Sequence, residues 1–158
     1  AWDSLWYEGR LVASYARERL RYIFPHVSPS RVTGTPTVAR VVVDERLNDI
    51  GVRAVKAIDP KPSGFYCLDL KEGEDGVPRV TEVNAKAHTT FALWSYAAVK
   101  ALGMGPEANV PYAYVKFGLE GEGPEAGPDF LPEGAVLVRH IDAGAVLILP
   151  SGEVRRVL

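Results

Sequence analysis

The sequence predicts an α+β protein in which a mainly antiparallel sheet is flanked by helices. One observation is a series of β-prone apolar runs separated by turn residues, clearest on either side of Asp75-Gly76, a dipeptide typical of hairpins. Another is the segment 44–60, whose apolar residues recur at helical spacing. With 158 residues, the chain is long enough to bury a core, and we expect a single domain over 1–158.

Turn residues and periodicity place the expected elements in order. Asp44 is expected to cap the first helix and Pro60 to stop it, while Gly103 ends a second helix that opens near Thr89. We expect strands at 1–7, 11–21, 64–69, 80–84, 135–139 and 145–149, loops at 24–36 and 118–132, and a polar bend at 139–142.

Composition narrows the class of protein. Hydrophobic residues make up 47% and charged residues 24%, a globular profile, and the formal charge of −2 argues against a nucleic-acid binder. Cys67 is the single cysteine, so we expect no internal disulfide and a buried, inert thiol. No apolar run approaches the roughly 18 residues that span a bilayer, so we expect a cytoplasmic protein without a membrane partner. The absence of Gln and the scarcity of Asn, Met and Cys favour a thermophilic source.

The hairpin around Asp75-Gly76 brings acidic residues together. A two-residue turn there pairs Asp69 with Glu82, and like charges in direct opposition require a positive charge between them. Asn84 lies two residues beyond Glu82 and therefore faces the same side. Carboxylate and amide oxygens suit magnesium, so these three residues form a candidate metal site that a divalent ion would neutralise. Solvated acids are the alternative, and a one-residue bulge would break the pairing.

Three arginines follow in alternation on the second expected strand. Arg17, Arg19 and Arg21 share one face if the chain is extended, and their mutual repulsion is best offset by anions such as phosphates. A solvated arginine stripe is the alternative. The loop 24–36 offers Arg31, Thr33 and Thr35 as substrate contacts or as plain surface, and His88 has no partner evident from sequence.

The segment from Gly64 through Asp69 to Glu82-Val83-Asn84 resembles the C-terminal catalytic part of ATP-grasp enzymes, most closely relatives of the carbamoyl-phosphate synthase large subunit. The resemblance is best over 1–105 and weaker over 106–158. In that superfamily an acidic residue and a Glu-x-Asn about 13 positions later hold the magnesium ions that bridge the phosphates of ATP. The resemblance therefore implies ATP and Mg²⁺, or Mn²⁺ in its place, as cofactors held by Asp69, Glu82 and Asn84.

The same resemblance implies a ligase that phosphorylates a carboxylate and joins the acyl phosphate to an amine or another nucleophile. Lys86 stands where many members carry an arginine near the transferred phosphate. We assign Lys86 and Arg19 to catalysis, and Arg17, Arg21, Asp69 and Glu82 to the nucleotide, although the resemblance does not select among the three arginines.

Further expectations concern partners. Family members carry an N-terminal nucleotide-binding lobe upstream of the matched part, so we expect this chain to be a fragment or one half of a split enzyme, with that lobe supplied in cis or in trans. Small-molecule substrates and a homo-oligomer are compatible with the sequence. The alternatives are a non-catalytic ATP-grasp-like assembly or regulatory domain and a small α/β binding module without nucleotide.

Overall fold

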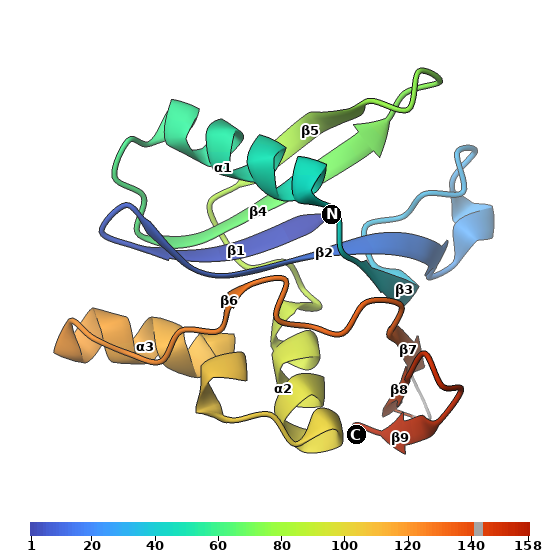
Figure 1. The fold of residues 1–158 in the computed structure, drawn as a ribbon. Helices are drawn as coiled ribbons and strands as arrows, with labels where there is room; N and C mark the ends of the chain where they lie inside the picture. Colours follow the sequence, from blue (N-terminus) through green and yellow to red (C-terminus); the bar gives the residue numbers. More distant parts are fainter. Residues whose placement is uncertain (141–143) are drawn as a thin grey trace.

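The computed structural model describes residues 1–140 and 144–158 and has the expected α+β architecture (Figure 1). The described strands form one sheet in the order β5-β4-β1-β2-β3-β7-β8-β9, and all of these neighbours are antiparallel, whereas the short β6 pairs in parallel with β2. The strands are β1 Trp2–Tyr7, β2 Arg10–Tyr22, β3 Pro36–Val42, β4 Gly64–Glu72, β5 Pro78–Asn84, β6 Gly127–Pro128, β7 Val136–His140, β8 Gly144–Ile148 and β9 Val154–Arg156.

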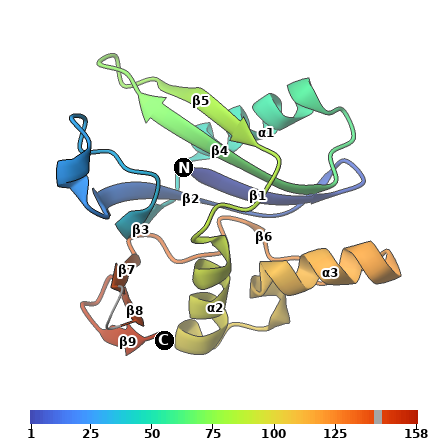
Figure 2. The same cartoon turned by 180° about the vertical axis from the view of Figure 1, so that it is seen from behind.

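Helices cover both faces of the sheet. The α-helices are α1 Glu45–Ile58, α2 Phe91–Leu102 and α3 Val110–Glu120, with single 3-10 turns at Pro25–Val27 and Pro106–Ala108. Figures 1 and 2 show α1 on one side of the β1-β2-β4-β5 region and α2 and α3 on the other. Within the described residues, none of the helices is both long enough and apolar enough to cross a membrane.

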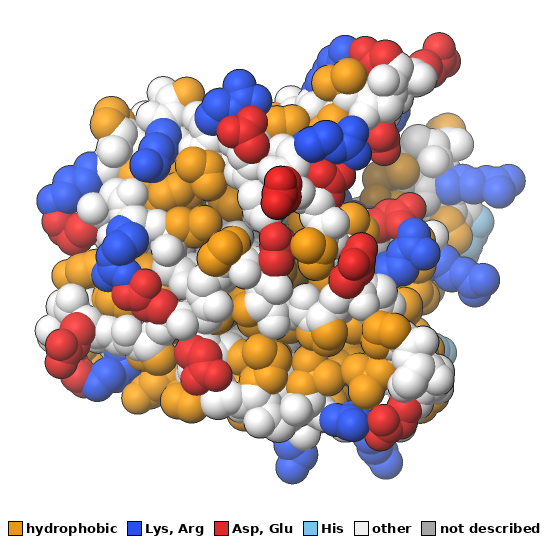
Figure 3. Space-filling view, viewed as in Figure 1, with side chains coloured by type: hydrophobic (Ala, Val, Ile, Leu, Met, Phe, Trp, Pro, Cys, Tyr) orange, Lys and Arg blue, Asp and Glu red, His pale blue; other side chains and the backbone are white. Residues whose placement is uncertain are grey.

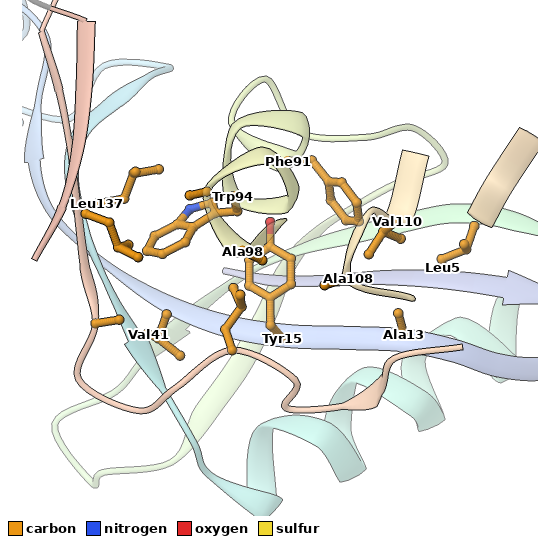
Figure 4. Packing of buried hydrophobic residues seen from close by; sticks show 14 of the residues in the cluster. Leu5, Ala13, Tyr15, Val41, Phe91, Trp94, Ala98, Ala108, Val110 and Leu137 are labelled. Atoms are coloured by element: carbon orange, nitrogen blue, oxygen red, sulfur yellow. The ribbon is translucent and has the colours of Figure 1, made fainter. Parts of the chain in front are cut away.

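Alternation along β1 explains why the sheet has two covered faces. Trp2 and Trp6 belong to a buried cluster with Val55 of α1, whereas Leu5 belongs to the larger cluster on the α2 side. The larger cluster centres on Tyr15, whose ring lies 5.6 Å from Phe91 and 6.2 Å from Trp94 between ring centroids (Figure 4). Asp3 also points to the α2 side, where it contacts the polar residues Arg17 and His88 at the edge of the apolar core.

The hairpin β4-β5 pairs Asp69 with Glu82 as expected, but by a different route. Glu72 faces Pro78, so residues 73–77 form the turn in place of a two-residue turn at Asp75-Gly76. The longer turn shifts the register by one residue, and an irregularity between Asp69 and Leu70 shifts it back. The bulge that would have separated the two acids instead restores their pairing.

The C-terminal third differs most from the sequence prediction. The helix α3 was not predicted, because its aromatic and β-branched residues carry little helical periodicity. Asn109 caps its N-terminus through the Tyr112 N–H, and Gly121 ends it with a left-handed backbone, so local signals for a helix were present. The expected bend at 139–142 falls partly outside the described residues, since 141–143 are not described.

Candidate functional site

A pocket of about 360 Å³ opens on the α2 side of the sheet, where β2, β4, β5 and the segment leading into α2 meet. Six of the seven site residues expected from sequence line it, namely Arg17, Arg19, Asp69, Glu82, Asn84 and Lys86. The seventh, Arg21, is exposed and does not line it. Pairing between β2 and β3 is irregular on both sides of Arg21, so the strict alternation that would align the three arginines ends at Arg19.

The oxygen donors of the expected metal site lie on adjacent strands. Asp69 is the direct partner of Glu82. Asn84 pairs with Cys67, two residues further along each strand, so it faces the same side of the sheet. Glu82 is exposed and Asn84 half-buried, and within the described part of the chain neither side chain has a hydrogen-bond or ion-pair partner. The donor set consists of hard oxygens, two of them on side chains without a described partner, and so it fits magnesium.

The Arg19 guanidinium supplies a positive charge to Asp69. Arg19 Nη1 donates to Asp69 Oδ2 at 3.0 Å, and Arg19 Nη2 contacts Asp69 Oδ1. Burial alone would raise the pKa of Asp69, but the hydrogen bonds and charge of Arg19 lower it below its ordinary value. Arg19 therefore neutralises Asp69, whereas Glu82 has no ion-pair partner among the described residues. Pairing within one hairpin could not reveal this partner on β2.

Arg17 is also neutralised by the protein itself. It is 2% exposed and forms an ion pair with Asp3 of β1, which is 0% exposed. Burial lowers the pKa of Arg17 to about 10, with the charge of Arg19 adding to the effect, so Arg17 remains charged at neutral pH. Its charge was expected to be offset by a phosphate, but the structure gives that role to Asp3.

His88 links the two ion pairs. Its Nδ1 lies 2.6 Å from Asp3 Oδ1 and its Nε2 lies 3.4 Å from Asp69 Oδ1. Burial lowers the pKa of His88 to about 4, with the charge of Arg17 second, so the ring is neutral at neutral pH. Sequence reasoning found no partner for His88, because both partners are distant in sequence, on β1 and β4.

Cys67 is buried beside this cluster, as expected. The thiol is fully buried, and burial raises the pKa of Cys67, which keeps it protonated. Ligand atoms of Asp3, Cys67 and His88 lie within 4.8 Å of one another. A cation at that position would meet the guanidinium of Arg17, which already contacts Asp3, so we do not place a metal there.

The remaining lining residues come from the loop after β2 and from the segment before α2. Thr33 lines the pocket, but its hydroxyl donates to the Ile23 carbonyl at 2.5 Å, whereas Arg31 is exposed and Thr35 does not line the pocket. Lys86 is exposed at the rim. Thr90 Oγ1 is buried without a hydrogen-bond partner among the described residues. The pocket therefore combines cationic, acidic and hydroxyl groups from five segments.

Comparisons with known proteins add no relative to this description. No protein-family model matches the chain, and neither a curated protein nor a solved structure matches it.

Proposed function

We propose that this chain is the C-terminal catalytic part of an ATP-grasp ligase that activates a carboxylate as an acyl phosphate and joins it to an amine or similar nucleophile. The observation that carries the proposal is the convergence of Asp69, Glu82 and Asn84 in one pocket with Arg19 and Lys86. Phosphoryl transfer needs positioning and neutralisation of charge more than a protein nucleophile, and these groups provide both.

Each residue has a role set by its chemistry. Asp69, Glu82 and Asn84 would hold magnesium, which would supply positive charge to stabilise the phosphoryl group in transfer. Lys86 at the rim carries a compact positive charge suited to the transferred phosphoryl group. Arg19 can keep one contact to Asp69 and offer its other N–H groups to a phosphate, since a guanidinium has five donors.

The partners follow from the same proposal. As in the superfamily, adenine and ribose would be held by a second, nucleotide-binding lobe, supplied in cis or in trans. The substrates are a small-molecule carboxylate and a nucleophile, and the cofactors are ATP with Mg²⁺ or Mn²⁺. A cytoplasmic location accords with a single buried, reduced Cys67.

The decisive experiment is the replacement of Glu82 in the protein together with that lobe. Glu82→Gln removes one anionic metal ligand but keeps a side chain of the same size at an exposed position. We therefore expect carboxylate-dependent ADP release to fall by at least about 10²-fold with little change in unfolding temperature. Hydroxylamine trapping of the acyl phosphate as a hydroxamate should fail in parallel.

The matched control is Glu74→Gln, at an exposed position in the turn of the same hairpin and outside the pocket. It should retain full activity. Near-normal ADP release by Glu82→Gln would reject the assignment.

A second candidate is a non-catalytic domain, favoured by one specific observation. Asp69, Arg19, Asp3 and Arg17 already neutralise one another in pairs, as expected of a structural ion-pair network. Such a domain would give no ADP release with any carboxylate, and Glu82→Gln would leave its assembly unchanged.

A further inference from the structure

We propose that two copies of this chain associate through the outer side of α3, packed antiparallel about a two-fold axis at Gly118. The inference does not depend on the proposed function, because α3 contributes no residue to the pocket that carries that function.

The helix α3 is apolar on the side away from the sheet as well as on the side that packs. Its inner side buries Val110, Ala113 and Phe117, and the Phe117 ring stacks on Tyr7 with 4.8 Å between ring centroids. Figures 1 and 2 show α3 at the margin of the molecule, with the sheet on one side of it. A helix in that position normally presents polar and charged residues to water, whereas a helix that is apolar all round is normally buried.

The outer side of α3 carries a stripe of three large apolar residues. Tyr112, Val115 and Leu119 recur at i, i+3 and i+7, so they lie on one face of the helix. Leu119 is 80% exposed, more than any other large apolar side chain among the described residues. Packing against a second apolar helix face would remove this stripe from water, which favours association.

Gly118 supplies a second, independent observation. A glycine inside a helix costs about 1 kcal/mol relative to alanine. An added Cβ at Gly118 would meet no atom within 4 Å, so no contact within the described part of the chain requires the glycine. Gly118 borders the stripe beside Val115 and Leu119, and the missing side chain lets another backbone approach closely. We therefore place the crossing point of the two helices at Gly118.

The charges beside the stripe favour a second copy of this chain as the partner. Lys116 and Glu120 are the only charged residues of α3, and they form an ion pair along one edge of the stripe. In an antiparallel pair with its two-fold axis at Gly118, position 116 of one helix lies opposite position 120 of the other. Each lysine then faces the glutamate of the other copy, so the surface is complementary to itself.

The size of the contact sets the expected affinity. α3 has 11 residues and is therefore about 16 Å long. One face of such a helix from each copy buries less than the roughly 1,200 Å² at which standard specific interfaces begin. We therefore expect a reversible dimer with a Kd on the order of 10–100 µM.

Sedimentation velocity at protein concentrations from about 1 µM to about 1 mM tests the association. The unmutated chain should pass from the mass of one chain to the mass of two. Leu119→Lys introduces two like charges near the axis and should raise the Kd at least about tenfold. Ile58→Lys is the matched control, because Ile58 is an exposed apolar residue on α1, and it should leave the Kd unchanged.

Charge exchange tests the antiparallel arrangement itself. Lys116→Glu and Glu120→Lys should each dimerise poorly alone, because like charges then face each other. An equimolar mixture of the two variants should associate like the unmutated chain, since opposite charges meet again between the copies. Mixing could not repair an ion pair that matters only within one chain.

Gly118→Ala separates the interface from the fold. In dilute solution, where the chain is monomeric, the substitution should raise Tm because alanine favours the helix. The same variant should weaken the dimer, because the added methyl groups hold the two helices apart.

Several outcomes would overturn the inference. An unmutated chain that stays monomeric up to about 1 mM does so without dependence on how any variant folds. A dimer that Leu119→Lys leaves intact, or that Ile58→Lys weakens equally, would place the contact elsewhere. A mixture of the charge variants that stays monomeric would reject the antiparallel pair. All of these results concern mass and not ADP release, so they are independent of the outcome for the ligase.

Discussion

At the scale of single residues, the site is governed by which positive group each acid contacts. Asp69 contacts Arg19 and Asp3 contacts Arg17, while Glu82 has no such partner among the described residues. A metal that enters this pocket therefore competes with Arg19 for Asp69. Metal binding and arginine pairing should act against each other.

Replacing Arg19 by Gln tests this competition. Because a guanidinium beside the site repels a second cation, we expect Arg19→Gln to strengthen nucleotide-free Mn²⁺ binding by at least about tenfold, measured by calorimetric titration. The same variant should lose carboxylate-dependent ADP release if Arg19 acts on phosphate. Arg21→Gln, exposed on the same strand and outside the pocket, should alter neither quantity. Weaker Mn²⁺ binding in Arg19→Gln would show that the arginine supports the site.

The buried pair of Asp3 and Arg17 contributes to the fold in a way that exposed pairs do not. Asp3→Asn leaves the guanidinium of Arg17 buried and uncompensated, so we expect a loss of about 3–5 kcal/mol in the free energy of unfolding, measured with urea. Asp75→Asn breaks an exposed pair with Arg79 and should change stability little. A similar small effect at Asp3 would mean that Arg17 finds another partner.

At the scale of elements, the packing of α1 on the sheet depends on a missing side chain. A Cβ atom at Gly51 would lie 2.6 Å from the Trp2 indole, which is rigid and fully buried. We expect Gly51→Ala to destabilise the protein by about 1–3 kcal/mol, although alanine is intrinsically favoured in helices by about 1 kcal/mol.

The control is another helical glycine. Gly118 on α3 has no atom within 4 Å of an added Cβ, so Gly118→Ala should stabilise by about 0.5–1 kcal/mol. Thermal unfolding of the two variants should give shifts of opposite sign. Stabilisation by both would mean that α1 moves away from Trp2 without cost.

Some of the helices and strands could be predicted from the sequence and others could not. Alternation and turn residues were sufficient for β1, β2, β4, β5, β7 and β8 and for α1, because Asp44 and Pro60 delimit that helix locally. β3, β6 and β9 were not predicted. The pairing of Asp69 with Glu82 was also predicted, because hairpin register is a local property. α3 was not predicted, since its aromatic and β-branched composition favours a strand.

The contacts between distant segments lay beyond sequence reasoning. Arg19 with Asp69, and His88 with both Asp3 and Asp69, depend on the strand order β4-β1-β2 and on the path from β5 to α2. Nothing in a single sequence specifies that order. Six residues that line the pocket could therefore be named from sequence, but their charge partners could not.

At the scale of the whole molecule, many of the charges are paired locally. The face seen in Figure 3 carries Lys and Arg beside Asp and Glu with no field of a single sign, in keeping with a formal charge of −2. Long-range attraction of a polyanionic nucleotide is therefore weak, and binding must come from contacts within the pocket. Nucleotide binding should then be coupled to folding, because the pocket draws residues from β2, the loop after it, β4, β5 and the segment before α2.

That coupling gives a prediction about the whole fold. A ligand present at about 100 times its Kd adds roughly 2.7 kcal/mol to the stability of the form it binds, which for a chain of this size raises the unfolding temperature by about 5–10 °C. We expect this shift when metal and ATP are added together, a smaller one with metal alone, and its loss in Glu82→Gln but not in Glu74→Gln. The ligase requires the shift together with ADP release, whereas a non-catalytic ATP-grasp-like domain that still binds nucleotide would show the shift alone. A pocket built from five segments cannot bind a nucleotide without stabilising their assembly. Absence of any shift, together with an Asp69→Ala variant that stays functional, would therefore leave the small binding module as the explanation.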